Sequence, residues 1–495
     1  MLGPSAPSWS QDSSSTRNFN VLLITVDCLR PDHMGLYGYS RGTTPSIDKF
    51  FEGAARFSNA FAHSAWTSPA MISLLTGLYP AVHGMDARGK FFDRNFETPL
   101  KQLQKEGYLT LGYDTAQNYA NQGWDGEIKK GALIETLKKY QDKKFFAWAH
   151  FREPHLPYSP PEEFKNIFFK GPYSTTQEKL SLLATEEKIP KGTAALEAGD
   201  AAAIRDLYDA EVLYQDSILG NLFDFLNSNG LAERTIVILT ADHGEELMEH
   251  GFIGHASTSE AATLFDEVIR IPLLIRVPGN TYPEPIQDTA RQIDVMPTLF
   301  DLLRLKPQPI MQGESLLPLF TGKGRGPPRP VFMETSYCGW QCPEARRAER
   351  IHAARHGGWK LIEERTPGET RYALYHIDKD PMEKENLFGK EFEKTRELGK
   401  LLLSRQKSNL KTAYSLALRA VQKHLEAAEE LLRENNCGAA LEELQEALHL
   451  NEIYSIENPS FVQDPEYAPG WKEIMARVHE KLGRVYVKKA RNATP

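Results

Sequence analysis

The feature that most constrains the fold is a series of short, almost continuously apolar runs, separated by tens of residues that include helical stretches. Such runs are typical of strands buried on both faces, and their alternation with helices predicts a mostly parallel sheet. The five runs cover residues 20–27, 109–115, 145–151, 235–242 and 271–277. We therefore expect an α/β fold whose mostly parallel central sheet is sandwiched by helices.

Carboxylates end two of these runs, at Asp27 and Asp242, and loop residues follow each of them at once. In open α/β sheets, ligands bind outside the carboxyl ends of the strands. Both acids are therefore expected to point into one crevice.

The C-terminal part of the chain has a different pattern. Pro-rich turns follow Pro278, and residues 349–387 then alternate apolar and polar side chains, which predicts a small antiparallel sheet. From Phe392 the periodicity is helical, with a hairpin turn at residues 435–438 that resembles one tetratricopeptide-type repeat. One hairpin is too short for an independent solenoid, so we expect it to pack on the main body or on a second copy of the chain. The expected division is a leader (1–18), a catalytic α/β domain (19–280), a C-terminal subdomain (281–391) and a helical tail (392–495).

Charge and hydropathy exclude several classes of protein. The 58 basic and 66 acidic residues give a formal net charge of -8, which offers no electrostatic reason to bind a nucleic-acid polymer or an anionic membrane. No apolar run approaches the ~18 residues of a membrane-spanning helix. The first twenty residues lack the apolar core of a signal peptide. We expect a soluble protein, either cytoplasmic or exported with its signal removed.

The four cysteines are too few for a disulfide framework in a chain of 495 residues. Cys338 and Cys342 have a spacing compatible with one disulfide, Cys437 falls in the predicted helical turn, and Cys28 follows Asp27. We interpret Cys28 as a small buried residue, because a thiolate would be unusual in an oxygen-rich, hard metal site.

Four patches carry the residue types of a catalytic site. They are residues 26–33, 66–77, 151–158 and 241–255. In the second, Thr67 is predicted at the N-cap of a helix, with Pro69 in its first turn and Gly77 at its end. A hydroxyl there lies at the positive end of the helix dipole, where an alkoxide or a bound anion is stabilised.

At these patches the sequence resembles the sulfatase and alkaline phosphatase superfamily, over roughly residues 18–390. The matching motifs, in chain order, are VD-x-LR-x-DH, TSP-x4-LLTG-x-YP-x-x-HG, PH-x-PY, a helix with Tyr208 and Asp216, ADHGE-x4-HG-x3-H, and LYHIDKDPMEKENL. Any one of them would be a weak signal, whereas six in this order are a strong one.

The resemblance implies a hydroxyl nucleophile on a metal ion, in-line attack on a phosphorus or sulfur ester, and a covalent intermediate that water clears. Thr67 is the implied nucleophile, and His155 and His255 would face the non-bridging oxygens or the leaving group. Carboxylate and imidazole ligands suit a divalent cation that activates a hydroxyl near neutral pH. The implied metal ligands are Asp27, Thr67, Asp242 and His243.

The chain departs from the sulfatase pattern at its nucleophile. Sulfatases carry a Cys or Ser that becomes formylglycine, followed four positions on by Arg; here the residues are Thr67 and Met71, and Thr cannot be converted. The second acid at the first strand end and the Lys near the DHG segment are replaced by Cys28 and His255. The set Asp, Thr, Asp, His is instead similar to phosphodiesterases of the superfamily and to phosphoethanolamine transferases.

A second metal is not expected, because two-zinc members need an Asp-x3-His pair where this chain has Asp216 and Gly220. Asp216 is interpreted as structural. We expect one divalent ion, with Zn or Mn favoured by the histidine ligand and Ca or Mg as alternatives.

The function that the sequence favours is metal-dependent hydrolysis of small phosphodiesters or phosphomonoesters through Thr67. The alternatives are a sulfuric ester hydrolase that works without formylglycine, a phosphoryl-group transferase, and a non-catalytic scaffold whose helical tail recruits partners. The same helices are a candidate surface for homo-oligomer formation.

Overall fold

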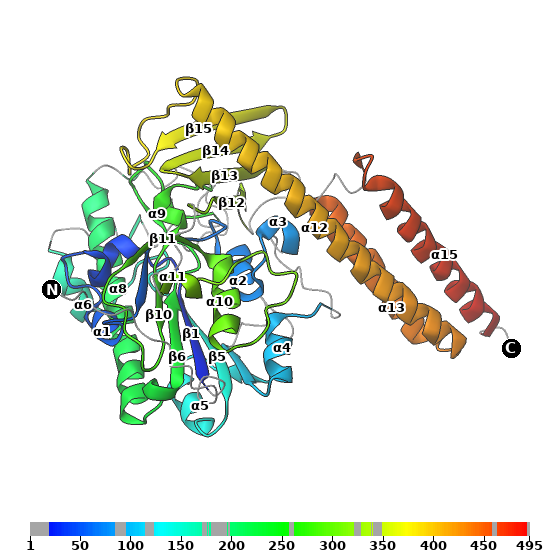
Figure 1. Ribbon diagram of the computed structural model, residues 1–495, viewed down its shortest axis with the longest axis horizontal. Coiled ribbons are helices and arrows are strands. Elements are labelled where there is room, and N and C mark those ends of the chain that lie inside the picture. Colours follow the sequence, from blue (N-terminus) through cyan, green and yellow to red (C-terminus); the bar gives the residue numbers. More distant parts are fainter. Residues whose placement is uncertain are drawn as a thin grey trace.

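The computed structural model describes residues 19–84, 96–113, 123–170, 176, 178–179, 196, 199–256, 262–320, 328–337, 339, 349–457 and 463–492. The leader and the Cys338–Cys342 pair lie outside these residues. A large sheet with helices on both sides forms the main body, a small sheet lies beside it, and long C-terminal helices extend away from it (Figure 1).

The large sheet is parallel at its centre and mixed at one edge. Strand β1 (Asn20–Val26) lies between β5 (Phe145–Phe151) and β6 (Thr235–Thr240) and is parallel to both. On the β5 side, β3 (Leu109–Tyr113) and β4 (Gly126–Ile128) continue in the parallel direction. This confirms the predicted α/β fold with a mostly parallel sheet.

The other edge begins with β10 (Leu273–Arg276), which is antiparallel to β6 and to β2 (Ala55–Phe61). Strand β11 (Ile286–Arg291) is parallel to β2, and β9 (Arg270–Ile271) pairs with β2. The five apolar runs of the sequence all contain strands of this sheet, whereas β2, β4 and β11 were not predicted.

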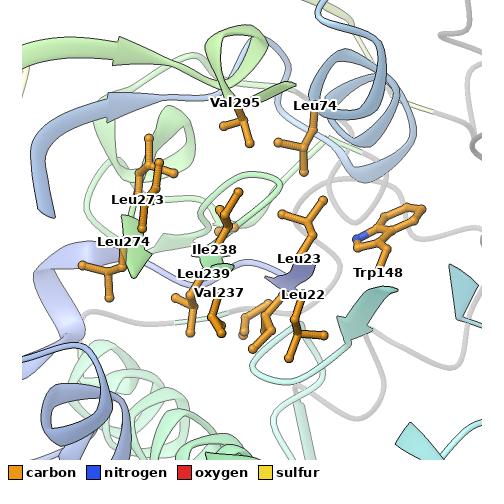
Figure 2. Packing of buried hydrophobic residues seen from close by; sticks show 14 of the residues in the cluster. Leu22, Leu23, Leu74, Trp148, Val237, Ile238, Leu239, Leu273, Leu274 and Val295 are labelled. Atoms are coloured by element: carbon orange, nitrogen blue, oxygen red, sulfur yellow. The ribbon is translucent and has the colours of Figure 1, made fainter. Parts of the chain in front are cut away.

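Helices cover both faces of the sheet. Figure 2 shows Leu74 of α2 and Val295 of α10 above the sheet residues Leu23 and Ile238, while Leu22 points to the opposite face. The helices of the main body are α1 (Pro45–Phe50), α2 (Thr67–Thr76), α3 (Pro80–His83), α4 (Pro99–Lys105), α5 (Leu133–Lys139), α6 (Glu162–Phe168), α8 (Asp200–Ser228), α9 (Asp266–Ile269), α10 (Val295–Leu302) and α11 (Leu317–Phe320).

The small sheet is antiparallel, as the alternation of residues 349–387 predicts. Its strands are β12 (Val331–Ser336), β13 (Arg350–His356), β14 (Trp359–Thr366) and β15 (Glu369–His376). Lys360 attaches this sheet to α9, because its buried ammonium donates to Asp266 at 2.6 Å and to Glu383 at 2.8 Å.

The tail consists of α12 (Phe392–Arg433), α13 (Cys437–Glu457) and α15 (Ala468–Asn492). In the first part of α12, Leu398 packs on the small sheet and Leu402 packs on both the main body and the small sheet. The rest of α12 forms a second apolar core with α13 and α15 around Trp471. The predicted hairpin and third helix are confirmed, and the hairpin packs on the main body through α12. None of the described helices is long and apolar enough to cross a bilayer.

Candidate active site

The end of β1 places Asp27 and Cys28 at the carboxyl edge of the sheet. The N–H of Asp27 donates to the carbonyl of Phe151 at 2.8 Å, which extends the β1–β5 pairing by one residue. At Cys28 the backbone turns into the left-handed region, with φ of 60°. The N–H of Cys28 donates to Oδ1 of Asp242 at 3.2 Å, and the Tyr208 hydroxyl donates to the Cys28 carbonyl at 2.7 Å. The first bond holds the strand end against the loop after β6, and the second holds it against α8.

Thr67 is the first residue of α2 and not its N-cap, which corrects the prediction by one position. Trp66 holds the N-cap position with an extended backbone (φ -160°, ψ 160°). The Thr67 hydroxyl therefore does not cap its own helix, and its Oγ1 lies 3.4 Å from Nε2 of His243. Gly77 ends the helix with φ of 70°, as predicted.

The loop after β6 provides Asp242 and His243, both fully buried. Nδ1 of His243 donates to the carbonyl of Gly244 at 2.8 Å, so Nε2 carries the lone pair. That nitrogen lies 3.3 Å from Oδ2 of Asp242 and 3.8 Å from Oδ1 of Asp27. Three residues from two different strand ends thus meet around one point.

The two further predicted histidines line the same site. The ring of His255 lies 4.4 Å from that of His243 and 4.8 Å from that of His155, measured between centroids. Nδ1 of His255 lies 3.1 Å from Oε1 of Glu245, and Tyr158 donates to Oε2 of Glu245 at 2.5 Å. Asp27, Thr67, His155, Asp242, His243 and His255 are therefore brought together in one site.

Burial and charge set the protonation of the site. Burial alone would raise the pKa of Asp27, but the electrostatic interactions with His155, His150 and His243 outweigh it and hold that pKa well below its usual range. Burial, and next the charge of Asp27, raise the pKa of Asp242 to about 6. Burying two adjacent carboxylates costs folding free energy unless a cation neutralises their charge.

Several contacts of the site were not predicted from the sequence. His150 lies on β5 opposite Thr25 of β1, and its Nε2 is 3.6 Å from Oδ2 of Asp27. The sequence pattern that could have indicated His150 is a single ionisable residue near the end of an otherwise apolar strand. Glu245 stood within the fourth patch without an assigned role. The ring of His250 stacks on that of Phe265, with 3.7 Å between the centroids. Asp216 accepts hydrogen bonds from the N–H groups of Ser46 and Ile47 at the start of α1, and these contacts agree with its interpretation as a structural residue.

The donor set fits a divalent metal ion. Donor atoms of Asp27, Asp242 and His243 all lie within 4.8 Å of one another. Oδ2 of Asp242 is buried and accepts no hydrogen bond from the residues that the structure describes. A buried carboxylate oxygen without a hydrogen-bond donor needs another partner, and a cation provides one.

Comparison with known proteins identifies the family. A family model described as Sulfatase matches residues 19–305, which is more than half of the chain. The chain belongs to the sulfatase family. The model described as N-sulphoglucosamine sulphohydrolase, C-terminal, matches residues 254–409 of this family member. The resemblance expected from the six motifs is thereby confirmed.

Individual relatives of this sulfatase-family chain are distant. It is 26% identical to iduronate 2-sulfatase of Mus musculus over an aligned length of 353 residues. The alignment covers 56% of this chain and 62% of that enzyme, which is less than two thirds of the enzyme's length. A solved structure of phosphonate monoester hydrolase from Agrobacterium radiobacter has a TM-score of 0.65 and 23% identity, covering 79% of this chain and 96% of that one. A structure in complex with D-glucosamine-2-N,6-O-disulfate also has a TM-score of 0.65, with 20% identity, covering 79% of this chain and 98% of that one. At these identities the solved structures show the fold alone.

Proposed function

We propose that this chain hydrolyses phosphate esters, either phosphodiesters or phosphomonoesters, with Thr67 as the nucleophile. The observation that carries the proposal is the 3.4 Å separation between Oγ1 of Thr67 and Nε2 of His243, beside the Asp27–Asp242 pair. The hydroxyl does not cap α2, lies at the start of that helix and faces His243. These are the surroundings in which a weak hydroxyl nucleophile becomes activated.

Asp27, Thr67, Asp242 and His243 would hold the cation. A divalent ion supplies positive charge that lowers the pKa of a neighbouring hydroxyl and offsets charge on the transferred group. The imidazole of His243 favours Zn or Mn, with Ca or Mg as alternatives for the carboxylates.

The side chains then divide the reaction into two steps. Oγ of Thr67, after losing its hydroxyl proton to solvent, attacks phosphorus in line. The bond from phosphorus to the ester oxygen breaks on the opposite side, and that oxygen leaves with a proton that we assign to His155. The first turn of α2 offers backbone N–H groups to the non-bridging oxygens. In the second step water attacks the threonyl phosphate.

His255 is assigned to that attacking water. Burial, and next the electrostatic interaction with His243, lower the pKa of His255 to about 4, so its ring is neutral near pH 7. Nδ1 faces the Glu245 carboxylate, so we assign the opposite ring nitrogen, Nε2, to accept the proton of the water. The carboxylate would stabilise the imidazolium as it forms.

The choice of phosphate over sulfate is supported by the chemistry of threonine. Its Cβ carries a methyl group and a single hydroxyl, so an ester on Oγ can leave only when water attacks phosphorus or sulfur. A formylglycine hydrate has a second hydroxyl that expels sulfate. Sulfuric ester hydrolysis is the second candidate, and the family match together with the 26% identity to iduronate 2-sulfatase favours it.

The test compares an aryl phosphate monoester, an aryl phosphate diester and an aryl sulfate, each with and without a chelator. We expect a phosphate ester to be turned over fastest, and chelation to abolish that turnover. Thr67→Val should lower kcat by about 10³-fold or more, because it removes the nucleophile and keeps the side-chain shape.

Thr67→Ser, which keeps a hydroxyl, and Ser68→Ala, which removes the next hydroxyl along α2, are the matched controls and should retain turnover. Faster turnover of the sulfate would reject the phosphate assignment in favour of the second candidate. Activity that survives both chelation and Thr67→Val would reject the mechanism.

A further inference from the structure

The thiol of Cys28 points into the group of donor atoms formed by Asp27, His243 and His255. Its Sγ is 3.3 Å from Oδ1 of Asp27, to which the S–H donates, and 3.5 Å from Nδ1 of His255. Cys28 is fully buried. In the part of the chain that the structure describes, three groups of residues have the spacing of metal ligands, and Cys28 belongs to two of them. They are Asp27–Cys28–His155, Cys28–His243–His255 and Asp27–Asp242–His243.

The separation between Cys28 and Asp27 is close to that between two ligands of one zinc ion. Zinc binds sulfur at about 2.3 Å and carboxylate oxygen at about 2.1 Å, which places a tetrahedral sulfur–oxygen pair about 3.6 Å apart. The sulfur–oxygen distance of 3.3 Å between Cys28 and Asp27 differs from this by a few tenths of an ångström. Small movements of side chains would complete the coordination.

A second observation points to a cation at the same place. Oδ1 of Asp242 accepts from the N–H of Cys28, while Oδ2 is buried, lies 3.3 Å from Nε2 of His243 and accepts no hydrogen bond from described residues. The residue that orients the Cys28 backbone thus presents an oxygen without a hydrogen-bond donor to the same donor cluster.

We propose that Cys28 is a ligand of the cation in this site, so that the site prefers a thiophilic ion such as Zn²⁺ to Ca²⁺ or Mg²⁺. The inference rests on the proposed metal-dependent function and names the chemistry of its cation. Binding forms a metal–sulfur bond, releases the thiol proton to solvent and changes no oxidation state. Thiolate sulfur selects softer metals, whereas Ca²⁺ and Mg²⁺ prefer oxygen.

The test uses Co²⁺ as a spectroscopic substitute for Zn²⁺ in the full chain, after chelator treatment and under reducing conditions. Wild type should bind Co²⁺ with a sulfur-to-cobalt charge-transfer band in the near ultraviolet. Cys28→Ser should lose that band and bind Zn²⁺ at least about 10-fold more weakly. Cys28→Asp, which replaces sulfur with a carboxylate, should shift the preference toward Ca²⁺ and Mg²⁺.

A triple variant, Cys338→Ser/Cys342→Ser/Cys437→Ser, is the matched control and should retain the band, since it keeps Cys28 alone. Stoichiometric Co²⁺ binding by wild type without the band would overturn the proposal, even if Cys28→Ser fails to fold. Absence of any Co²⁺ binding would overturn it as well. Phosphate ester turnover, assayed on the same samples, tests the proposed function separately. Chelator-sensitive turnover without a cobalt–sulfur band would contradict the assignment of Cys28 as a ligand and would still support the proposed function.

Discussion

Nε2 of His150 lies 3.6 Å from Oδ2 of Asp27, and the other ring nitrogen lies 3.0 Å from Oγ1 of Thr25. Burial alone would lower the pKa of His150, but the hydrogen bond and the charge of Asp27 outweigh it and raise that pKa. The Trp148 indole donates to Oγ1 of Thr25 at 2.9 Å, so the hydroxyl that contacts the His150 imidazole is itself held in place. His150 therefore holds one oxygen of Asp27 and leaves Oδ1 facing the donor cluster.

Replacing His150 with Gln should weaken metal binding by ~10- to 100-fold, because residues that orient a metal ligand commonly contribute that much to affinity. Competition with a chelating dye measures the affinity. His250→Gln is the matched control, since His250 stacks on Phe265 and belongs to none of the donor groups. Equal metal affinities of the two variants would contradict the role given to His150.

Glu245 is predicted to position His255. Glu245→Gln weakens the acceptor for Nδ1 and should lower kcat by about 10- to 100-fold with little change in KM. Glu246→Gln is the control: burial and the charge of Glu267 raise the pKa of Glu246 to about 8, so its side chain is mostly neutral at pH 7 and an amide replaces it conservatively. A pH profile of kcat that Glu245→Gln leaves unshifted would argue for a purely structural role.

Much of the fold was predictable because buried parallel strands are almost continuously apolar. The runs that contain β1 and β6 also end in Asp27 and Asp242, and strand ends of one sheet edge meet in space, so the carboxylate pair was predictable too. Strand β2 was not predictable, because Arg56, Ser58 and Asn59 interrupt its apolar residues and it lies toward the mixed edge of the sheet.

The direction of the Cys28 side chain was also beyond the sequence. It depends on a left-handed backbone, which non-glycine residues seldom adopt, and on bonds to Asp242 and Tyr208 from distant parts of the chain. The sequence alone placed Cys28 next to Asp27 and supported its interpretation as a small buried residue. Tertiary contacts put the sulfur among the donor atoms of Asp27, His243 and His255.

Glu211 should make the stability of the protein depend on pH. Its Oε1 accepts from the N–H of Ser159, and burial raises its pKa from 4.5 to about 7. A raised pKa means that the folded state binds the proton more tightly than the unfolded state does. The contribution of Glu211 to the free energy of unfolding is therefore complete below about pH 4.5 and is lost as the pH rises through 7. The loss amounts to ~3 kcal/mol for a shift of this size.

Urea unfolding of wild type and Glu211→Gln at pH 5 and pH 8 measures this dependence. The variant should lose less free energy of unfolding than wild type between the two pH values, because its amide does not ionise. Glu233→Gln, at an exposed position, should behave like wild type. A variant with the same pH dependence as wild type would show that Glu211 ionises normally in the folded state.

Leu402 and Leu403 of α12 offer a matched test of how the tail is attached. Leu402 is 4% exposed and packs with residues of α3 and the small sheet, whereas Leu403 is 51% exposed. Leu402→Ala should lower the free energy of unfolding by ~2–5 kcal/mol through loss of apolar burial and a cavity, while Leu403→Ala should change it by less than ~0.5 kcal/mol. Urea unfolding measures both free energies.

Leu402→Ala should also increase protease cleavage within residues 392–433, because α12 continues from this contact into the core around Trp471. An unchanged cleavage pattern would contradict attachment of the tail through Leu402.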